Sequence, residues 1–155
     1  MEEKIKICRE CVDLNIMENT EQTVLRHLTG LMTAQGFVQE VYADKICERE
    51  REYPTGLQFP NIAIALPHGD SSYVETSAIA IGKCREKVIF HSMEDPEEEI
   101  PVELVVLLAV KQPETHLAVL NNLIEMFSIP EKCNEILSAD EEQICRIFQE
   151  TLYKE

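Results

Sequence analysis

The chain has 155 residues, of which 45% are hydrophobic and 28% are charged, a composition typical of one globular domain spanning residues 1–155. Its formal net charge of −15 argues against nucleic acids and anionic membranes as partners, because both would repel it, and is compatible with a basic protein partner. No apolar run is long enough to span a bilayer and no apolar signal segment follows Met1, so we expect a cytoplasmic protein without direct membrane insertion.

The first predicted elements are a strand and a helix. Apolar and polar residues alternate over residues 11–17, which is typical of a half-buried strand. Asn19 or Thr20 then caps a helix with apolar residues at helical spacing, and Gly36 ends it. Thr23 stands where a capping box has glutamate, so this box is expected to be incomplete.

After a second predicted helix, residues 39–50, the chain changes to strand-forming sequence. The turn residues Pro54-Thr55-Gly56 end that helix. Four apolar or β-branched segments are then interpreted as strands: residues 62–66, 76–81, 87–91 and 102–110. The short gap between the second and third segments is typical of a hairpin and predicts an antiparallel pair. The last segment is almost continuously apolar, so we expect burial on both faces of a sheet.

Helical periodicity returns in the last third of the chain. Residues 115–127 have apolar positions at helical spacing, Pro130 is suited to the first position of another helix, and Asp140 can cap a last one that continues to Leu152. Helices at both ends with strands between them predict an α/β (α+β) fold. We expect a single domain with a central mixed β-sheet flanked by helices.

His68 is the strongest catalytic candidate among the four histidines. It follows the predicted strand 62–66 directly, so its imidazole should lie at the rim of the sheet, where it can act as nucleophile, base or metal ligand. Gly69 beside it would allow another molecule to approach closely. An ordinary turn explains the Pro-His-Gly sequence equally well. His27 is expected on the surface of the first helix, and His91 has no catalytic pattern around it.

His116 and an arginine are the candidates that could join His68. His116 lies just after the long strand 102–110, so the two imidazoles converge on one rim if strands 62–66 and 102–110 run in the same direction. Arg49 and Arg51 end the second helix. They are either surface charges or hold an anion, because a guanidinium matches the geometry of phosphate.

Other site types receive little support. The six cysteines are expected to be free thiols, and the pair Cys8 and Cys11 has neither a second pair for zinc nor the strand-then-helix context of a thioredoxin-type site. The acidic residues 94–99 are interpreted as a solvated loop, with a divalent-metal loop as the alternative. No nucleotide-binding, serine-elbow or HExxH motif occurs. We therefore expect no cofactor and no metal, and a phosphoryl group would have to come from a protein or small-molecule donor.

Two separated blocks of sequence carry a family resemblance. The first contains Arg49-Glu50, Pro54-Thr55-Gly56-Leu57 and residues 62–69, and the second contains residues 101–109, followed by Thr115-His116-Leu117 and Leu120. These blocks resemble, in the same order, the fructose/mannitol-type IIA components of bacterial sugar phosphotransferase systems, and the flanking helices also fit. The long stretch between Pro54 and His68 is most similar to the galactitol-type branch.

The resemblance implies a phosphotransferase that acts as a phosphoryl carrier. His68 would accept the group on Nε2 from the phosphocarrier protein HPr and donate it to a cysteine of a IIB component beside a membrane IIC transporter. His116 and Arg49 would complete the site, and the sugar would be galactitol or a related polyol. The alternative is a stand-alone regulatory IIA-like phosphoprotein that signals through partner binding. A metal hydrolase using His68, His116 and an acidic residue lacks a recognisable ligand spacing.

Overall fold

The computed structural model describes residues 4–152 and contains a five-stranded mixed sheet in the order β1-β4-β5-β3-β2. The apolar segment predicted as the most buried strand forms β5 (Glu99–Ala109), in the middle of the sheet. It is antiparallel to β4 (Ala78–His91) and parallel to β3 (Ala63–Ala65). The edge strands are β1 (Val12–Ile16), parallel to β4, and β2 (Gly56–Gln58), antiparallel to β3.

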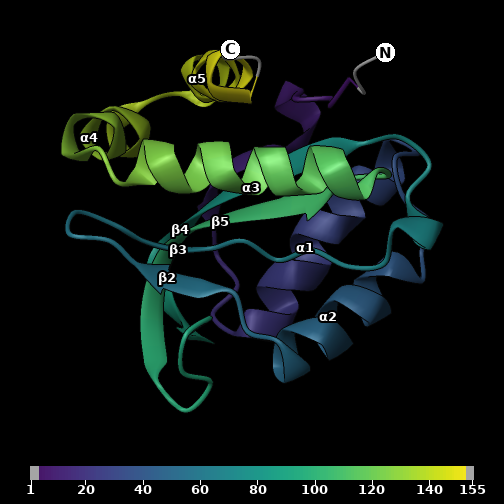
Figure 1. Cartoon of the computed structure of the whole chain (residues 1–155), viewed down its shortest axis with the longest axis horizontal. Helices are drawn as coiled ribbons and strands as arrows, with labels where there is room; N and C mark the ends of the chain where they lie inside the picture. Colours follow the sequence, from purple (N-terminus) through teal and green to yellow (C-terminus); the bar gives the residue numbers. More distant parts are fainter. Residues whose placement is uncertain (1–3, 153–155) are drawn as a thin grey trace.

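Helices cover both faces of this sheet, as Figure 1 shows. The helices packed on one face are α1 (Glu21–Ala34) and α2 (Tyr42–Glu52). Those on the other face are α3 (Pro113–Phe127), α4 (Pro130–Ser138) and α5 (Glu141–Leu152). Two short 3-10 helices are η1 (Arg9–Cys11) and η2 (Ser71–Tyr73). The predicted fold class, a mixed sheet flanked by helices, is confirmed.

The side chains of β5 divide the interior into two cores. Successive residues of a strand point to opposite faces of the sheet. Val105 and Leu107 accordingly belong to the core shared with α1 and α2, whereas Val106 and Leu108 belong to the core shared with α3, α4 and α5. All four are fully buried, which confirms the predicted burial of this strand on both faces.

The sheet does contain antiparallel pairs, but no hairpin joins residues 76–81 and 87–91, because the chain from Ala78 to His91 is the single strand β4. Its ladder with β5 continues on both sides of a register shift between Lys83 and Val88. The charged residues 85–87 are exposed at this bulge, and the first two lie in the short gap between the two predicted strand segments. The antiparallel partner of β4 is β5.

The start of α1 also differs from its prediction. The Thr20 hydroxyl accepts a hydrogen bond from the Thr23 amide (3.2 Å), and the Thr23 hydroxyl accepts one from the Thr20 amide (3.3 Å). The capping box is therefore complete, because the threonine hydroxyl does what a glutamate carboxylate usually does at this position.

Candidate functional site

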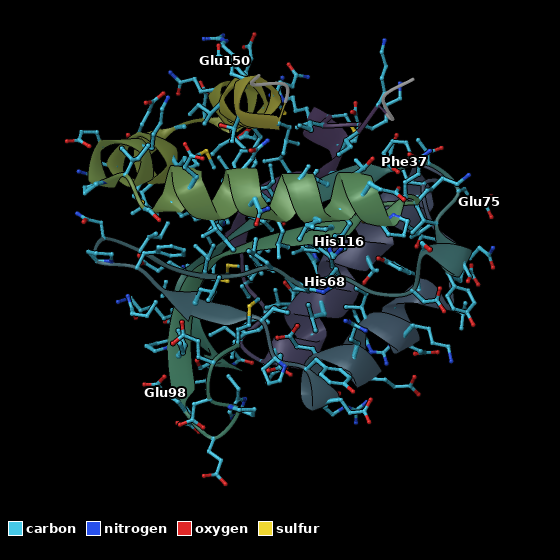
Figure 2. The ribbon with its side chains drawn as sticks, in the orientation of Figure 1. Phe37, His68, Glu75, Glu98, His116 and Glu150 are labelled. Carbon is cyan, nitrogen blue, oxygen red and sulfur yellow. The ribbon has the colours of Figure 1, made fainter. Side chains whose placement is uncertain are left out.

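The two candidate histidines meet at the edge of the sheet where β3 and β5 end. These strands are parallel, and the chain beyond β3 stays paired with β5, because the Leu108 amide donates to the Pro67 carbonyl oxygen (2.8 Å). His116 lies in the first turn of α3, which follows β5. The two imidazole rings have a centroid separation of 4.5 Å and an interplanar angle of 52° (Figure 2). The sequence predicted that the two imidazoles converge if these two strands run in the same direction, and they do.

The tautomer of His68 follows from its backbone contact. Its Nδ1 atom lies 2.9 Å from the carbonyl oxygen of Leu66. Because a carbonyl oxygen only accepts hydrogen bonds, Nδ1 must bear the proton, which leaves the lone pair on Nε2. Burial lowers the pKa of His68 to about 4, and the charges of His116 and Arg49 add to this effect against the opposing Leu66 hydrogen bond. The ring is therefore a neutral imidazole with a nucleophilic Nε2 near pH 7.

His116 has a buried ring nitrogen without a hydrogen-bond partner. Within residues 4–152, its Nε2 is the only buried side-chain nitrogen or oxygen that has no hydrogen-bond partner. Burial lowers the pKa of His116, and the charge of Arg49 lowers it further. A cavity of about 160 Å³ lies against both rings and is also lined by Ser71 and Leu108. Because buried polar atoms are normally paired, this nitrogen is suited to contact an oxygen of a bound group.

Arg49 belongs to this site electrostatically, whereas Arg51 does not. Arg49 is exposed in the last turn of α2, with its guanidinium carbon 5.3 Å from the centre of the Tyr53 ring. Its charge lowers the pKa of both site histidines. The Nε atom of Arg51 donates to the carbonyl oxygen of Cys47 (3.3 Å) instead.

Gly69 lies next to α2, at a distance that leaves a Cβ atom in ordinary van der Waals contact with it. A Cβ atom at this position would lie 3.4 Å from Cε1 of Tyr42 and 3.4 Å from Cδ1 of Ile46. The loop that contains His68 therefore lies close against α2. The Tyr42 hydroxyl also donates to the Leu108 carbonyl oxygen (2.9 Å), so α2 supports the end of β5 as well.

Two further residues next to the site, Glu50 and Thr55, belong to the family blocks but were assigned no role from the sequence. Glu50 is only 2% exposed, and its carboxylate accepts hydrogen bonds from the backbone amide of Thr55 (2.7 Å) and from the Thr55 hydroxyl (2.9 Å). A signal was available, because Glu50 follows Tyr42 and Ile46 at intervals of four residues and so lies on the buried face of α2.

The other two histidines make contacts away from this site. His27 was expected on the surface, but it is half-buried, with Nε2 2.7 Å from Oδ2 of Asp13 on β1. His91 is at the end of β4 away from the site, with Nδ1 3.8 Å from Oε2 of Glu21. All six cysteines are free thiols, as predicted. No three His, Cys, Asp or Glu side chains within residues 4–152 cluster as metal ligands.

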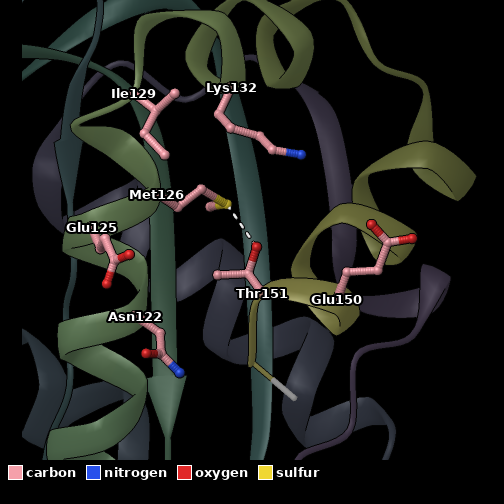
Figure 3. A pocket seen from close by; sticks show the side chains of 7 residues that line it. All are labelled: Asn122, Glu125, Met126, Ile129, Lys132, Glu150 and Thr151. Atoms are coloured by element: carbon pink, nitrogen blue, oxygen red, sulfur yellow. Dashed lines mark hydrogen bonds between the residues drawn. The ribbon is translucent and has the colours of Figure 1, made fainter. Parts of the chain in front are cut away.

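A second, larger cavity of about 240 Å³ lies between α3, α4 and α5 (Figure 3). Met126 of α3 and Thr151 of α5 meet in it, with the threonine hydroxyl 3.0 Å from the methionine sulfur. Its lining contains no histidine or cysteine, so it offers no nucleophile comparable to His68. In the part of the chain that the structure describes, no helix is both long and apolar enough to cross a membrane.

The chain is similar to known proteins over most of its length. Residues 7–151 match the family described as phosphoenolpyruvate-dependent sugar phosphotransferase system, EIIA 2. The galactitol-specific EIIA component of the phosphotransferase system of Escherichia coli K12 is 30% identical over 125 residues, 81% of this chain and 83% of the relative. These matches confirm the resemblance drawn from the two sequence blocks.

Two solved structures share the fold. The complex of enzyme IIA-Mtl and phosphorylated enzyme IIB-Mtl from Escherichia coli has a TM-score of 0.76 at 19% identity, over 94% of this chain and 99% of that chain. The nitrogen regulatory protein IIA-Ntr from Neisseria meningitidis has a TM-score of 0.75 at 21% identity, over 91% of this chain and 94% of that chain.

Proposed function

Because the chain belongs to the EIIA 2 family of the phosphoenolpyruvate-dependent sugar phosphotransferase system, we propose that it carries a phosphoryl group on Nε2 of His68. In this proposal it accepts the group from phosphorylated HPr in the cytoplasm and donates it to a cysteine of a IIB component, which serves a membrane IIC transporter. The galactitol-specific relative supports galactitol or a related polyol as the transported sugar.

One observation carries the proposal. Nδ1 of His68 is committed to the Leu66 carbonyl oxygen, so the free nitrogen of this neutral ring is Nε2, and the ring lies beside that of His116, whose Nε2 has no hydrogen-bond partner. A phosphoryl acceptor needs this combination of a lone pair and a nearby donor for phosphoryl oxygens. A metal hydrolase would need further ligands around the pair, and no such cluster occurs in residues 4–152.

In the accepting step, the Nε2 lone pair of His68 attacks phosphorus in line with the phosphorus–nitrogen bond of the donor phosphohistidine. The Nε2–phosphorus bond forms as the donor bond breaks, and the donor ring leaves. His116 donates from Nε2 to one phosphoryl oxygen when its proton is on that atom, and Arg49 contributes positive charge for the others. Both act by stabilising charge in the transition state, which is the main form of catalysis available in phosphoryl transfer.

In the donating step, the Leu66 carbonyl oxygen keeps the Nδ1 proton on the phosphorylated ring. A cysteine thiolate of the IIB component attacks phosphorus, the sulfur–phosphorus bond forms and the Nε2–phosphorus bond breaks. Because Nδ1 retains its proton, His68 leaves as a neutral imidazole, which is a better leaving group than an imidazolate anion. The same hydrogen bond (2.9 Å) therefore serves both steps.

The surface around the pair suits a transient protein partner. Leu117 follows His116 on α3, and Tyr53 lies under the Arg49 guanidinium; each of these apolar side chains is 62% exposed. Exposed aromatic and aliphatic side chains next to a site are typical of protein docking surfaces. We place the centre of the docking face for HPr and the IIB component on these residues.

The proposal is tested by incubating the purified protein with phosphorylated HPr and locating the phosphate by mass spectrometry. The variant His68→Ala should accept no phosphate, and the control variant His91→Ala should accept it at the wild-type level. Phosphorylation of His68→Ala at the wild-type level would overturn the proposal.

A second assay separates transport from regulation. The phosphorylated protein is mixed with a galactitol-type IIB component, and the label on the IIB cysteine is measured. Efficient transfer supports the transport role. A phosphorylated protein that transfers to no IIB component would favour the stand-alone regulatory alternative.

A further inference from the structure

We propose that Glu50 is a positioning residue that fixes the orientation and the tautomer of His68 through Thr55 and the backbone of Leu66. This inference rests on the proposed function in one respect, since it gives Glu50 a role in phosphoryl transfer by His68. The control of the His68 tautomer by the buried Glu50 carboxylate does not depend on any partner protein.

The first link is the burial of the Glu50 carboxylate. A carboxylate that is 2% exposed would be strongly destabilising without hydrogen-bond partners. Thr55 supplies hydrogen bonds to it: the backbone amide donates to Oε2 (2.7 Å), and the hydroxyl lies 2.9 Å from Oε1 and 3.0 Å from Oε2. The last turn of α2 is thereby fixed to the residue that precedes β2.

The second link is the direction of the Thr55 hydroxyl. This group has one proton, and above the Glu50 pKa of about 7 the ionised carboxylate can only accept hydrogen bonds, so the proton is then directed at Glu50. The hydroxyl oxygen is then free to accept from the Leu66 amide, which lies 3.1 Å away. The Thr55 carbonyl oxygen accepts from the same amide at 3.3 Å. Leu66 is therefore held by both the side chain and the backbone of Thr55.

The third link joins Leu66 to the nucleophile. The carbonyl oxygen of Leu66 accepts from Nδ1 of His68 (2.9 Å), and this contact places the lone pair on Nε2. The next residue, Pro67, has no amide hydrogen and so cannot help to anchor the chain as a donor. The Thr55 contacts hold Leu66, and the Leu108 amide holds the Pro67 carbonyl oxygen (2.8 Å); Glu50 orients one of the Thr55 contacts.

The test measures the His68 tautomer directly by NMR of the ¹⁵N-labelled protein, in which the two ring nitrogens have different shifts and couplings when protonated. The wild type should show a proton on Nδ1. The variants Glu50→Gln and Thr55→Val should increase the population with the proton on Nε2, and Thr55→Ser, which keeps the hydroxyl, should restore the wild-type pattern. Glu48→Gln is the matched control, because Glu48 is an exposed glutamate on the same helix that pairs with Lys45.

The second readout is the rate of phosphorylation by phosphorylated HPr. Misplacement of a nucleophile by a fraction of an ångström to 1 Å slows transfer by about tenfold to a hundredfold, so Glu50→Gln and Thr55→Val should be slower than wild type by this factor. A folded Glu50→Gln protein with the wild-type tautomer and rate would overturn the proposal. Should Glu50→Gln fail to fold, the comparison of Thr55→Val with Thr55→Ser decides the same point.

The two readouts also separate this inference from the proposed function. If wild-type protein accepts no phosphate from HPr, the proposed function fails, while the tautomer shifts still decide whether Glu50 controls His68. If phosphorylation occurs and the tautomer is unaffected by Glu50→Gln and by Thr55→Val, the carrier function stands and the role of Glu50 is refuted.

Discussion

Replacing His68 with asparagine should remove a pH-dependent part of the free energy of unfolding. Burial lowers the pKa of His68 from 6.5 to about 4, so between these values the unfolded chain binds a proton that the folded protein does not. The stability due to this neutral ring is fully present above pH 6.5 and is lost as the pH falls toward 4. This difference between the unfolded and folded pKa values corresponds to an unfolding free energy of about 3 kcal/mol at most, since the ring is only partly shielded from solvent.

Asparagine is the matched replacement, because its amide can donate to the Leu66 carbonyl oxygen that Nδ1 of His68 contacts at 2.9 Å. Urea unfolding of both proteins at a series of pH values gives the free energy of unfolding of each. The wild-type value minus the variant value should increase by up to about 3 kcal/mol from pH 4 to pH 7. Titrating groups shared by both chains largely cancel in this difference. Parallel stability curves would refute a buried, neutral His68.

Four further predictions follow from the site. Burial raises the pKa of Glu50 to about 7, against the lowering effects of Thr55 and Arg49 and with a smaller raising effect of Glu21. Glu50 therefore stabilises the fold least above pH 7. When the unfolding free energy of Glu50→Gln is subtracted from that of the wild type, the difference should fall as the pH rises from 4.5 to 7, whereas the corresponding difference for His68 rises. Rapid-quench phosphorylation should show Arg49→Ala and His116→Ala slowed by about a hundredfold, with His68 still the acceptor, and rates equal to wild type would leave them outside the mechanism. Phosphorylation by HPr should slow as NaCl is added, because the −15 charge attracts a basic partner; no salt effect would contradict this steering. Gly69→Leu should lower the unfolding free energy by about 1 to 3 kcal/mol in urea titrations, because the side-chain atoms beyond Cβ would press on α2, whereas unchanged stability would show that the loop can move to accommodate them.

The histidine pair illustrates what the sequence can and cannot supply. His68 directly follows a short apolar strand and His116 begins the helix after a long one, so each could be placed at a strand end from local pattern alone. Their convergence depends on whether β3 and β5 run in the same direction, which neither strand pattern encodes. The parallel pairing of these strands brings the two rings to a centroid distance of 4.5 Å.

The misread hairpin has a similar physical cause. Gly82 and the charged residues after it form a pattern that suits a turn as well as a bulge. The structure shows a different reason for the glycine: a Cβ at position 82 would collide with the Ile16 side chain and press on Leu28. Close packing of β4 against β1 and α1 therefore favours glycine here, and such packing becomes visible only when the neighbouring elements are in place.

The link from Glu50 to His68 depends on strand register in the same way. A carboxylate on the apolar face of α2 can be recognised from its spacing, but its partner cannot, because Thr55 lies in a segment with the composition of a turn. That segment continues into β2, and the antiparallel register sets Gly56 opposite Ala65. The next pair outward along such a register is Thr55 and Leu66. The pairing of β2 with β3 thus brings the hydroxyl that Glu50 orients to the residue that holds His68. A shift of this register by one residue would break the connection while leaving every local sequence signal unchanged.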